Sequence, residues 1–297
     1  MKKSTKRLCI LGISLCIAGG IMCGIGYFMD DSSISLSNIV STINVSTINS
    51  NEEKHLYKLE KTKISDIQSL DFELSTSSFK VESSDDASFY ISYHIQSAAK
   101  KDPISYEVKQ NKLQIKEEES DNYTNIDAED NEVILYVPKN NNLHDIKGNN
   151  DVGNINVKDL ICNSLNLSAD VGNISLTDME IRKGSSSSDV GNINITNSSL
   201  SDFETKTYTG NITASLVSIK NNITMNCDTG KINIHLSDKN TPIQIHAETN
   251  LGNIDVSDSL GGTLVKDVTE STYNLESSNP SGTLTLTVGT GNISIQS

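Results

Sequence analysis

A short motif centred on glycine recurs seven times in the second half of the chain. Its copies read DVGNINV, DVGNISL, DVGNINI, YTGNITA, DTGKINI, NLGNIDV and GTGNISI. The steps between successive motif glycines are 19, 19, 19, 20, 22 and 39 residues. A fixed period in this range is typical of a solenoid, in which each repeat forms one coil and stacks on its neighbours. The glycines are Gly153, Gly172, Gly191, Gly210, Gly230, Gly252 and Gly291.

Each motif carries the alternation of a β-strand. The residue two places after the glycine is always isoleucine, the residue four places after it is apolar, and a polar residue stands between them. This period of two predicts a strand with one buried face. A second alternating run precedes most glycines, and a coil this short has no room for two strands and a helix as well. The isoleucines, which we expect to form a core ladder, are Ile155, Ile174, Ile193, Ile212, Ile232, Ile254 and Ile293.

The predicted fold is therefore an all-β solenoid of about seven or eight coils. The last step, 39 residues, is close to two periods, so we expect a degenerate copy without its glycine near 271–276 (STYNLE). The chain ends on the strand GNISIQS with no evident cap. This end predicts an open edge and either a partner or self-association there, because an unpaired strand edge is a template for another strand.

The aspartate two places before several of the glycines is typical of a turn. Its carboxylate can cap a backbone N–H, and the glycine can adopt a positive φ. A sharper alternative is a cation ladder, because stacking would bring Asp151, Asp170 and Asp189 to within about 5 Å of one another. The turn is the simpler interpretation. The motif also lacks the second glycine and aspartate of calcium-binding nonapeptide repeats.

The N-terminus predicts a membrane anchor. Residues 1–7 are basic and form a short cytoplasmic tail, and residues 8–29 are uncharged and mostly apolar. A helix of this length covers about 33 Å, enough to cross the hydrocarbon core, and preceding positive charge keeps the N-terminus in the cytoplasm. Cleavage as a secretory signal is the alternative. We expect an uncleaved single-pass anchor in the cell membrane, with the β domain outside.

Three further regions follow the predicted span. Residues 30–55 are rich in Ser, Thr and Asn and form a tether. Residues 56–147 lack the motif but keep the strand pattern, so we expect an N-terminal β region that caps and starts the solenoid repeats of 148–297. Cys162 and Cys227 fall in different columns of the repeat, which predicts two buried free thiols.

The stretch VILYVPKNNNLHDIKGNNDVGNINV, followed by coils that repeat TGNI or VGNI turns, resembles the bacterial putative-adhesin family, a domain of unknown function built from β-strand repeats. The likeness spans about 56–297. It implies an outward β-solenoid, often behind an N-terminal membrane span, and surface attachment. It implies no catalytic residues.

The chain carries no recognisable catalytic, cofactor or metal motif. HExxH, CxxC, GxSxG and glycine-rich phosphate-loop patterns are missing from the sequence. The net charge of −14 disfavours nucleic acid and anionic lipid as ligands. The remaining enzyme class, a polysaccharide-acting β-helix enzyme, needs clustered acids, whereas the outward positions are mainly Asn, Ser and Thr.

We therefore expect a binding module rather than an enzyme, with an envelope glycan or a surface protein as its partner. The alternative is an accessory component of an envelope stress or signalling system. This alternative is motivated by the membrane span and its short cytoplasmic tail. The tail is too short to be a domain, so any signal would pass through a membrane partner.

Overall fold

The structure is a computed structural model of the 297-residue chain, and it describes residues 55–118, 131–139, 141, 143–237, 242–267 and 270–297. Every helix or strand element in this part is a β-strand, which confirms the all-β prediction for these residues. The predicted tail (1–7), membrane span (8–29) and all but the last residue of the tether (30–55) lie outside the described residues. Among the residues described, no helix is long and apolar enough to cross a membrane.

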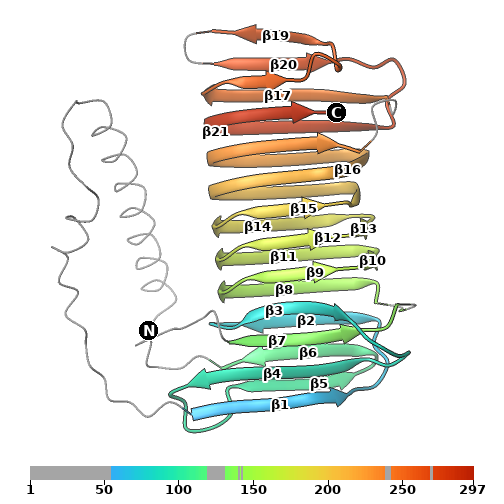
Figure 1. The fold of residues 1–297 in the computed structure, drawn as a ribbon, viewed down its shortest axis with the longest axis vertical. Coiled ribbons are helices and arrows are strands. Elements are labelled where there is room, and N and C mark those ends of the chain that lie inside the picture. Colours follow the sequence, from blue (N-terminus) through green and yellow to red (C-terminus); the bar gives the residue numbers. More distant parts are fainter. Residues whose placement is uncertain (1–54, 119–130, 140, 142, 238–241, 268–269) are drawn as a thin grey trace, which may run out of the picture. The chain divides into compact units, whose positions relative to one another are not determined.

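The repeats form stacked coils of three parallel columns of strands (Figure 1). Each strand of one coil pairs in parallel with the equivalent strand of the next, for example Ile174 with Ile155 and Ile181 with Cys162. The third, two-residue strand adds a column to the two that the sequence indicates. The first coils use β8 (Asp145–Val152), β9 (Ile155–Lys158), β10 (Ile161–Cys162), β11 (Ser164–Val171), β12 (Ile174–Thr177), β13 (Glu180–Ile181), β14 (Gly184–Val190) and β15 (Ile193–Thr196). The long strand β16 (Ser199–Leu236) continues the stack.

The C-terminal strand β21 (Gly282–Gln296) lies inside the stack, so the prediction of an open edge at GNISIQS is wrong. One side of β21 pairs with β16, and the other pairs with β17 (Ile243–Leu251) and β18 (Ile254–Val256). Ile293, for instance, lies between Ile232 and Ile254. The chain thus passes over one coil position and returns to fill it, which leaves no free strand edge there for self-association.

The predicted degenerate copy at 271–276 is not a coil of the stack. This segment forms β20 (Ser271–Leu275), which pairs antiparallel with β17, and β19 (Thr263–Lys266) pairs antiparallel with β20. An antiparallel strand cannot continue a parallel ladder, so the pair closes this end of the stack. The step of 39 residues therefore contains a cap rather than a missing coil.

The N-terminal end has a matching arrangement. The coil of β2 (Ser69–Leu74) and β3 (Ser78–Ser83) lies between β8 and β9 on one side and β6 (Lys112–Glu117) and β7 (Glu132–Val137) on the other. Three antiparallel strands complete this end: β5 pairs with β6, β4 with β7, and β1 with β4. They are β1 (His55–Lys63), β4 (Tyr90–Ser97) and β5 (Ile104–Lys109).

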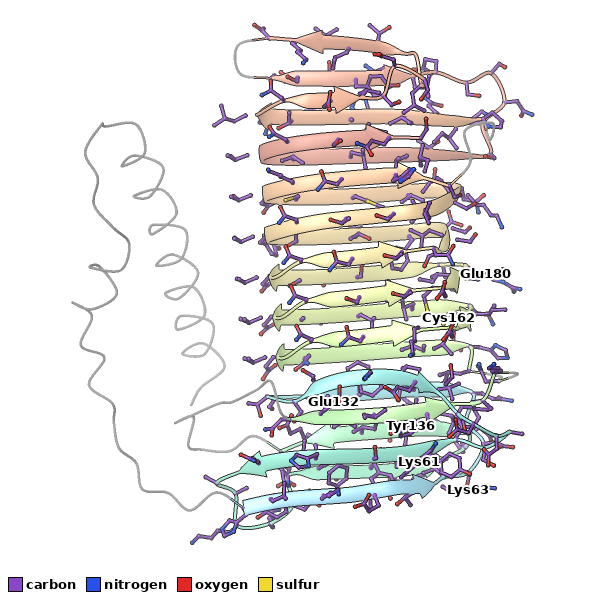
Figure 2. The ribbon with its side chains drawn as sticks, in the orientation of Figure 1. Lys61, Lys63, Glu132, Tyr136, Cys162 and Glu180 are labelled. Carbon is purple, nitrogen blue, oxygen red and sulfur yellow. The ribbon has the colours of Figure 1, made fainter. Side chains whose placement is uncertain are left out.

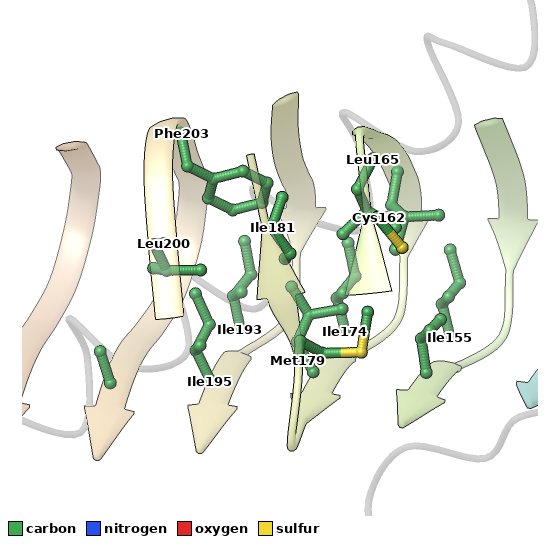
Figure 3. Packing of buried hydrophobic residues seen from close by; sticks show 14 of the residues in the cluster. Ile155, Cys162, Leu165, Ile174, Met179, Ile181, Ile193, Ile195, Leu200 and Phe203 are labelled. Atoms are coloured by element: carbon green, nitrogen blue, oxygen red, sulfur yellow. The ribbon is translucent and has the colours of Figure 1, made fainter. Parts of the chain in front are cut away.

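The interior is a continuous column of aliphatic side chains. All seven motif isoleucines have no exposed surface, and Figure 3 shows Ile155, Ile174 and Ile193 at successive positions. Phe72 and Phe79 stack with ring centroids 4.0 Å apart at the N-terminal end of the core. A Cβ on Gly148 would lie 2.0 Å from the Phe72 ring, so the glycine makes room for this ring.

The motif glycines form a second column, at a corner where backbones approach closely. Their φ angles lie between +137° and +157°, a range that disfavours any residue with a Cβ. A Cβ on Gly191 would lie 2.0 Å from the carbonyl oxygen of Gly172. Hydroxyl groups also bond these carbonyls: Ser188 Oγ donates to Gly172 at 2.8 Å, and Thr207 Oγ1 to Gly191 at 3.0 Å.

The asparagine that follows six of the seven motif glycines forms a ladder that the sequence analysis did not anticipate. Asn154 Oδ1 accepts hydrogen bonds from the backbone N–H and the side-chain amide of Asn173, at 2.9 and 3.1 Å. Asn173 and Asn192 do the same for the next coil, and Asn211 accepts from the backbone N–H of Lys231. Lysine has no side-chain oxygen, so the ladder stops there.

A buried carboxylate closes the N-terminal end of this corner. Glu117, 6% exposed, accepts bonds of 2.8 to 3.1 Å from the backbone N–H groups of Ser75, Thr76 and Ser77. It also accepts from the hydroxyls of Thr76 and Ser77. In the register of β2 on β8 this turn takes the place of Asp151–Gly153, and Glu117, the last residue of β6, satisfies its donors.

The position of β21 predicts its hydrogen exchange in the full-length chain. Amides of 283–288 should exchange slowly, because strands pair on both sides, while amides of β19, paired with β20 alone and exposed, should exchange fast. Exchange measured by mass spectrometry checks this. Equal rates in the two strands would place the C-terminal coil back at an end of the stack.

Joining the interrupted ladder should stabilise the fold. Lys231 lies opposite Asn292, and Asn292 Oδ1 accepts from the backbone N–H of Asn253 at 2.9 Å. Lys231→Asn supplies the missing acceptor, worth about 0.5–1 kcal/mol at an exposed site, or a rise of about 2 °C in melting temperature. Lys183→Asn, exposed and outside the ladder, is the control and should change little. A melting temperature that falls in Lys231→Asn contradicts the ladder's role.

Candidate functional site

One groove of about 940 Å³ crosses successive coils where the short third strand follows the turn before it. The turn residues and the outward residues of the third strands line it. Figure 2 shows one of the latter, Glu180, on β13. The turn residues are Asp159, Asp178, Asn197 and Leu216, and the outward strand residues are Ile161, Glu180, Ser199 and Ser218.

The turn residues share a left-handed backbone. Their φ angles lie between 49° and 58°, a region that Asp and Asn tolerate because their side chains bond locally. The N–H groups of Asp159 and Asp178 each donate to a carbonyl of the next coil at 3.1 Å. The backbone at the turns is thereby bonded, and the side chains are left to face the groove.

Leu216 departs from this pattern. A left-handed conformation costs an ordinary residue about 1–2 kcal/mol, yet Leu216 adopts φ 55° and leaves 47% of its surface exposed. Ile161, an outward strand residue of the groove, is 59% exposed. The groove therefore presents two aliphatic surfaces among polar groups.

Carboxylates outnumber amines in the groove. Glu82, Asp159, Asp178 and Glu180 line it together with Lys139 and Lys158. Three of the four acids already have polar partners. Lys80 Nζ lies 2.6 Å from Glu82 Oε1. Ser83 Oγ donates to Asp159 at 3.2 Å, and the Asn197 side-chain amide donates to Asp178. Neither His nor Arg is among the lining residues. This excess of carboxylates over amines favours a ligand with hydroxyl or amide groups over a polyanion.

The three aspartates of the proposed cation ladder lie in one column. Pairing of Ala169 with Asn150 and with Ser188 sets Asp170 between Asp151 and Asp189. Burial raises the pKa of Asp189, an effect that the nearby Lys206 opposes. Within the described ranges, no group of three or more His, Cys, Asp or Glu side chains is arranged to hold a metal ion. The motif glycines and isoleucines occupy the structural columns described above, away from the groove.

Cys162 and Cys227 are buried free thiols, as predicted. Burial raises the pKa of Cys162 to about 12 and that of Cys227 to about 11, and nearby Asp145 and Asp228 add to the respective shifts. Cys227 Sγ also donates to the Gly210 carbonyl at 3.2 Å. Both thiols are poor nucleophiles at neutral pH, because the thiolate is the reactive form.

Sequence reasoning missed the groove because its lining residues come from features too short to recognise. The third strands have only two residues, and the turn column mixes Asp, Asn and Leu. A signal was present at Asp159 and Asp178, which are 19 residues apart and have Asn197 at the next step. Nothing in the sequence marks Leu216 as left-handed.

Comparison with solved structures finds distant likenesses in fold. A putative adhesin from Bacteroides fragilis is 15% identical with a TM-score of 0.43, and the match covers 82% of this chain and 98% of that one. A putative cell adhesion protein from Clostridium sporogenes is 12% identical with a TM-score of 0.38 and the same coverage. A putative lipid binding protein from Parabacteroides distasonis is 15% identical with a TM-score of 0.34, covering 83% and 98%.

The search of curated proteins found no match. A family model described as Toastrack DUF4097 matches residues 67–204 and 187–296. These matches span most of the chain and confirm the resemblance to a β-repeat domain of unknown function. The chain belongs to the Toastrack DUF4097 family.

Proposed function

We propose that the chain is a non-catalytic binding module of the cell envelope, held by one N-terminal membrane span with its β domain outside. The groove across the coils carries the proposal. It offers about 940 Å³ beside an interior that is closed by aliphatic side chains, so a ligand would bind along the outside of the stack.

The sequence supports the proposed anchoring. The basic residues of 1–7 precede the apolar run of 8–29, and this order orients a single span with its N-terminus in the cytoplasm. A module that only binds a ligand outside the membrane requires neither a catalytic group nor a cytoplasmic domain.

The groove supports binding better than catalysis. General acid–base chemistry on a glycan needs a carboxyl pair placed on either side of the scissile bond. Asp159 and Asp178 follow one another along the same column of turns. Of the four acids that line the groove, Glu82 is ion-paired and these two accept side-chain hydrogen bonds, so no two of the four are both left without a partner. Their arrangement suits recognition of polar groups.

The proposal predicts that the full-length chain, kept in solution with a mild detergent, co-sediments with envelope material from cells that express it. Recovery should saturate with increasing protein, because a defined site is being filled. Heat-denatured chain is the control for non-specific adhesion. If native and denatured chains sediment alike, the proposed function is wrong, and capture of one membrane protein alone would instead favour the signalling accessory.

A further inference from the structure

We propose that the groove binds a linear glycan without acidic groups, laid along the direction in which the coils stack, with Leu216 as an apolar contact. The inference rests on the proposed function and names its ligand class. The groove crosses successive coils, whose paired strands lie about 4.8 Å apart, and equivalent turn residues recur at each step. A polymer of repeating units suits a surface of repeating subsites.

The side chains offer what a sugar requires. Hydroxyls of Ser199 and Ser218, the amide of Asn197 and the carboxylate of Asp178 can donate to or accept from sugar hydroxyls. The exposed aliphatic surfaces of Ile161 and Leu216 can pack against the C–H faces of the rings. An amphipathic ligand with both kinds of surface is thereby preferred to a purely polar one.

A peptide strand fits the groove less well. Strand addition requires unpaired backbone donors and acceptors at a sheet edge. The N–H groups of Asp159, Asp178 and Asn197 already donate to carbonyls of the next coil, at 2.9 to 3.1 Å. A ligand here meets side chains rather than a free edge.

The charge of the groove opposes an acidic polymer. Four carboxylates face two lysines among the lining residues, so an anionic chain would be repelled on balance. An uncharged glycan avoids this repulsion and can still bond to the carboxylates through its hydroxyls.

Leu216 provides a test that does not depend on damaging the fold. It is a strained, exposed leucine in a column whose other members are Asp and Asn. Strain of this kind persists only where the surrounding structure enforces it, and it clusters at functional sites. Asparagine tolerates the left-handed backbone, so Leu216→Asn should keep or raise the melting temperature while it removes the apolar contact.

The experiment uses the full-length chain in detergent and calorimetry with three probes: cellohexaose and the N-acetylglucosamine hexamer, both uncharged, and an alginate hexamer, which is acidic. We expect at least one uncharged hexamer to bind and Leu216→Asn to weaken that binding by about tenfold, an effect of about 1.4 kcal/mol. Leu251→Asn is the matched control, since Leu251 is 57% exposed and outside the groove, and it should leave binding unchanged.

Three results would overturn the inference: neither uncharged hexamer binds, the alginate hexamer binds as tightly, or Leu216→Asn and Leu251→Asn behave alike. Each is separate from failure of the proposed function. If the chain still co-sediments with envelope material, the binding module stands and its ligand or site is a different one. If co-sedimentation is lost as well, both proposals fail.

Discussion

The close approach of backbones at the glycine corner is the constraint on which the stack depends. A Cβ on six of the seven motif glycines would lie between 1.7 and 2.0 Å from a glycine carbonyl oxygen of the adjoining coil. Because no side chain intervenes, the adjoining asparagines come within hydrogen-bonding distance of one another. The same register aligns the isoleucines that form the core. Corner, ladder and core are therefore consequences of a single packing geometry.

The period of the repeat was enough to predict that the repeat region is all-β, and to predict its buried isoleucines and its glycine corner. It could not predict the order of coils at the ends. A glycine motif such as that around Gly291 indicates that a coil exists, but it does not indicate which coils lie beside it. The neighbours depend on the caps, because a coil can pair only with strand edges that the caps leave open. The antiparallel strand β20 occupies the outer edge of β17, so the last coil fits only between β16 and β17.

The candidate groove shows the same division between local pattern and packing. Asp159 and Asp178 are visible in the sequence as turn formers. That they share a groove with Ile161 and Glu180 depends on the two-residue strands that follow these turns and on the stacking of the coils. Leu216 could not be identified at all, because a leucine carries no sequence signal for the left-handed backbone that it adopts. Sites on solenoids arise from alignment between coils, which single-repeat patterns do not encode.

The most direct test of the close-packed corner compares Gly191→Ala with Gly153→Ala by denaturant unfolding. Both positions have positive φ, but a Cβ would lie 2.0 Å from the Gly172 carbonyl oxygen at Gly191 and 2.8 Å from the Ser77 carbonyl oxygen at Gly153. Both substitutions carry backbone strain of about 1–3 kcal/mol together with an overlap, but the overlap at Gly153 is much smaller. We therefore expect Gly191→Ala to lose more than about 4 kcal/mol or not to fold, and Gly153→Ala to lose clearly less. Equal losses would show that conformation, rather than contact between coils, is why glycine is required.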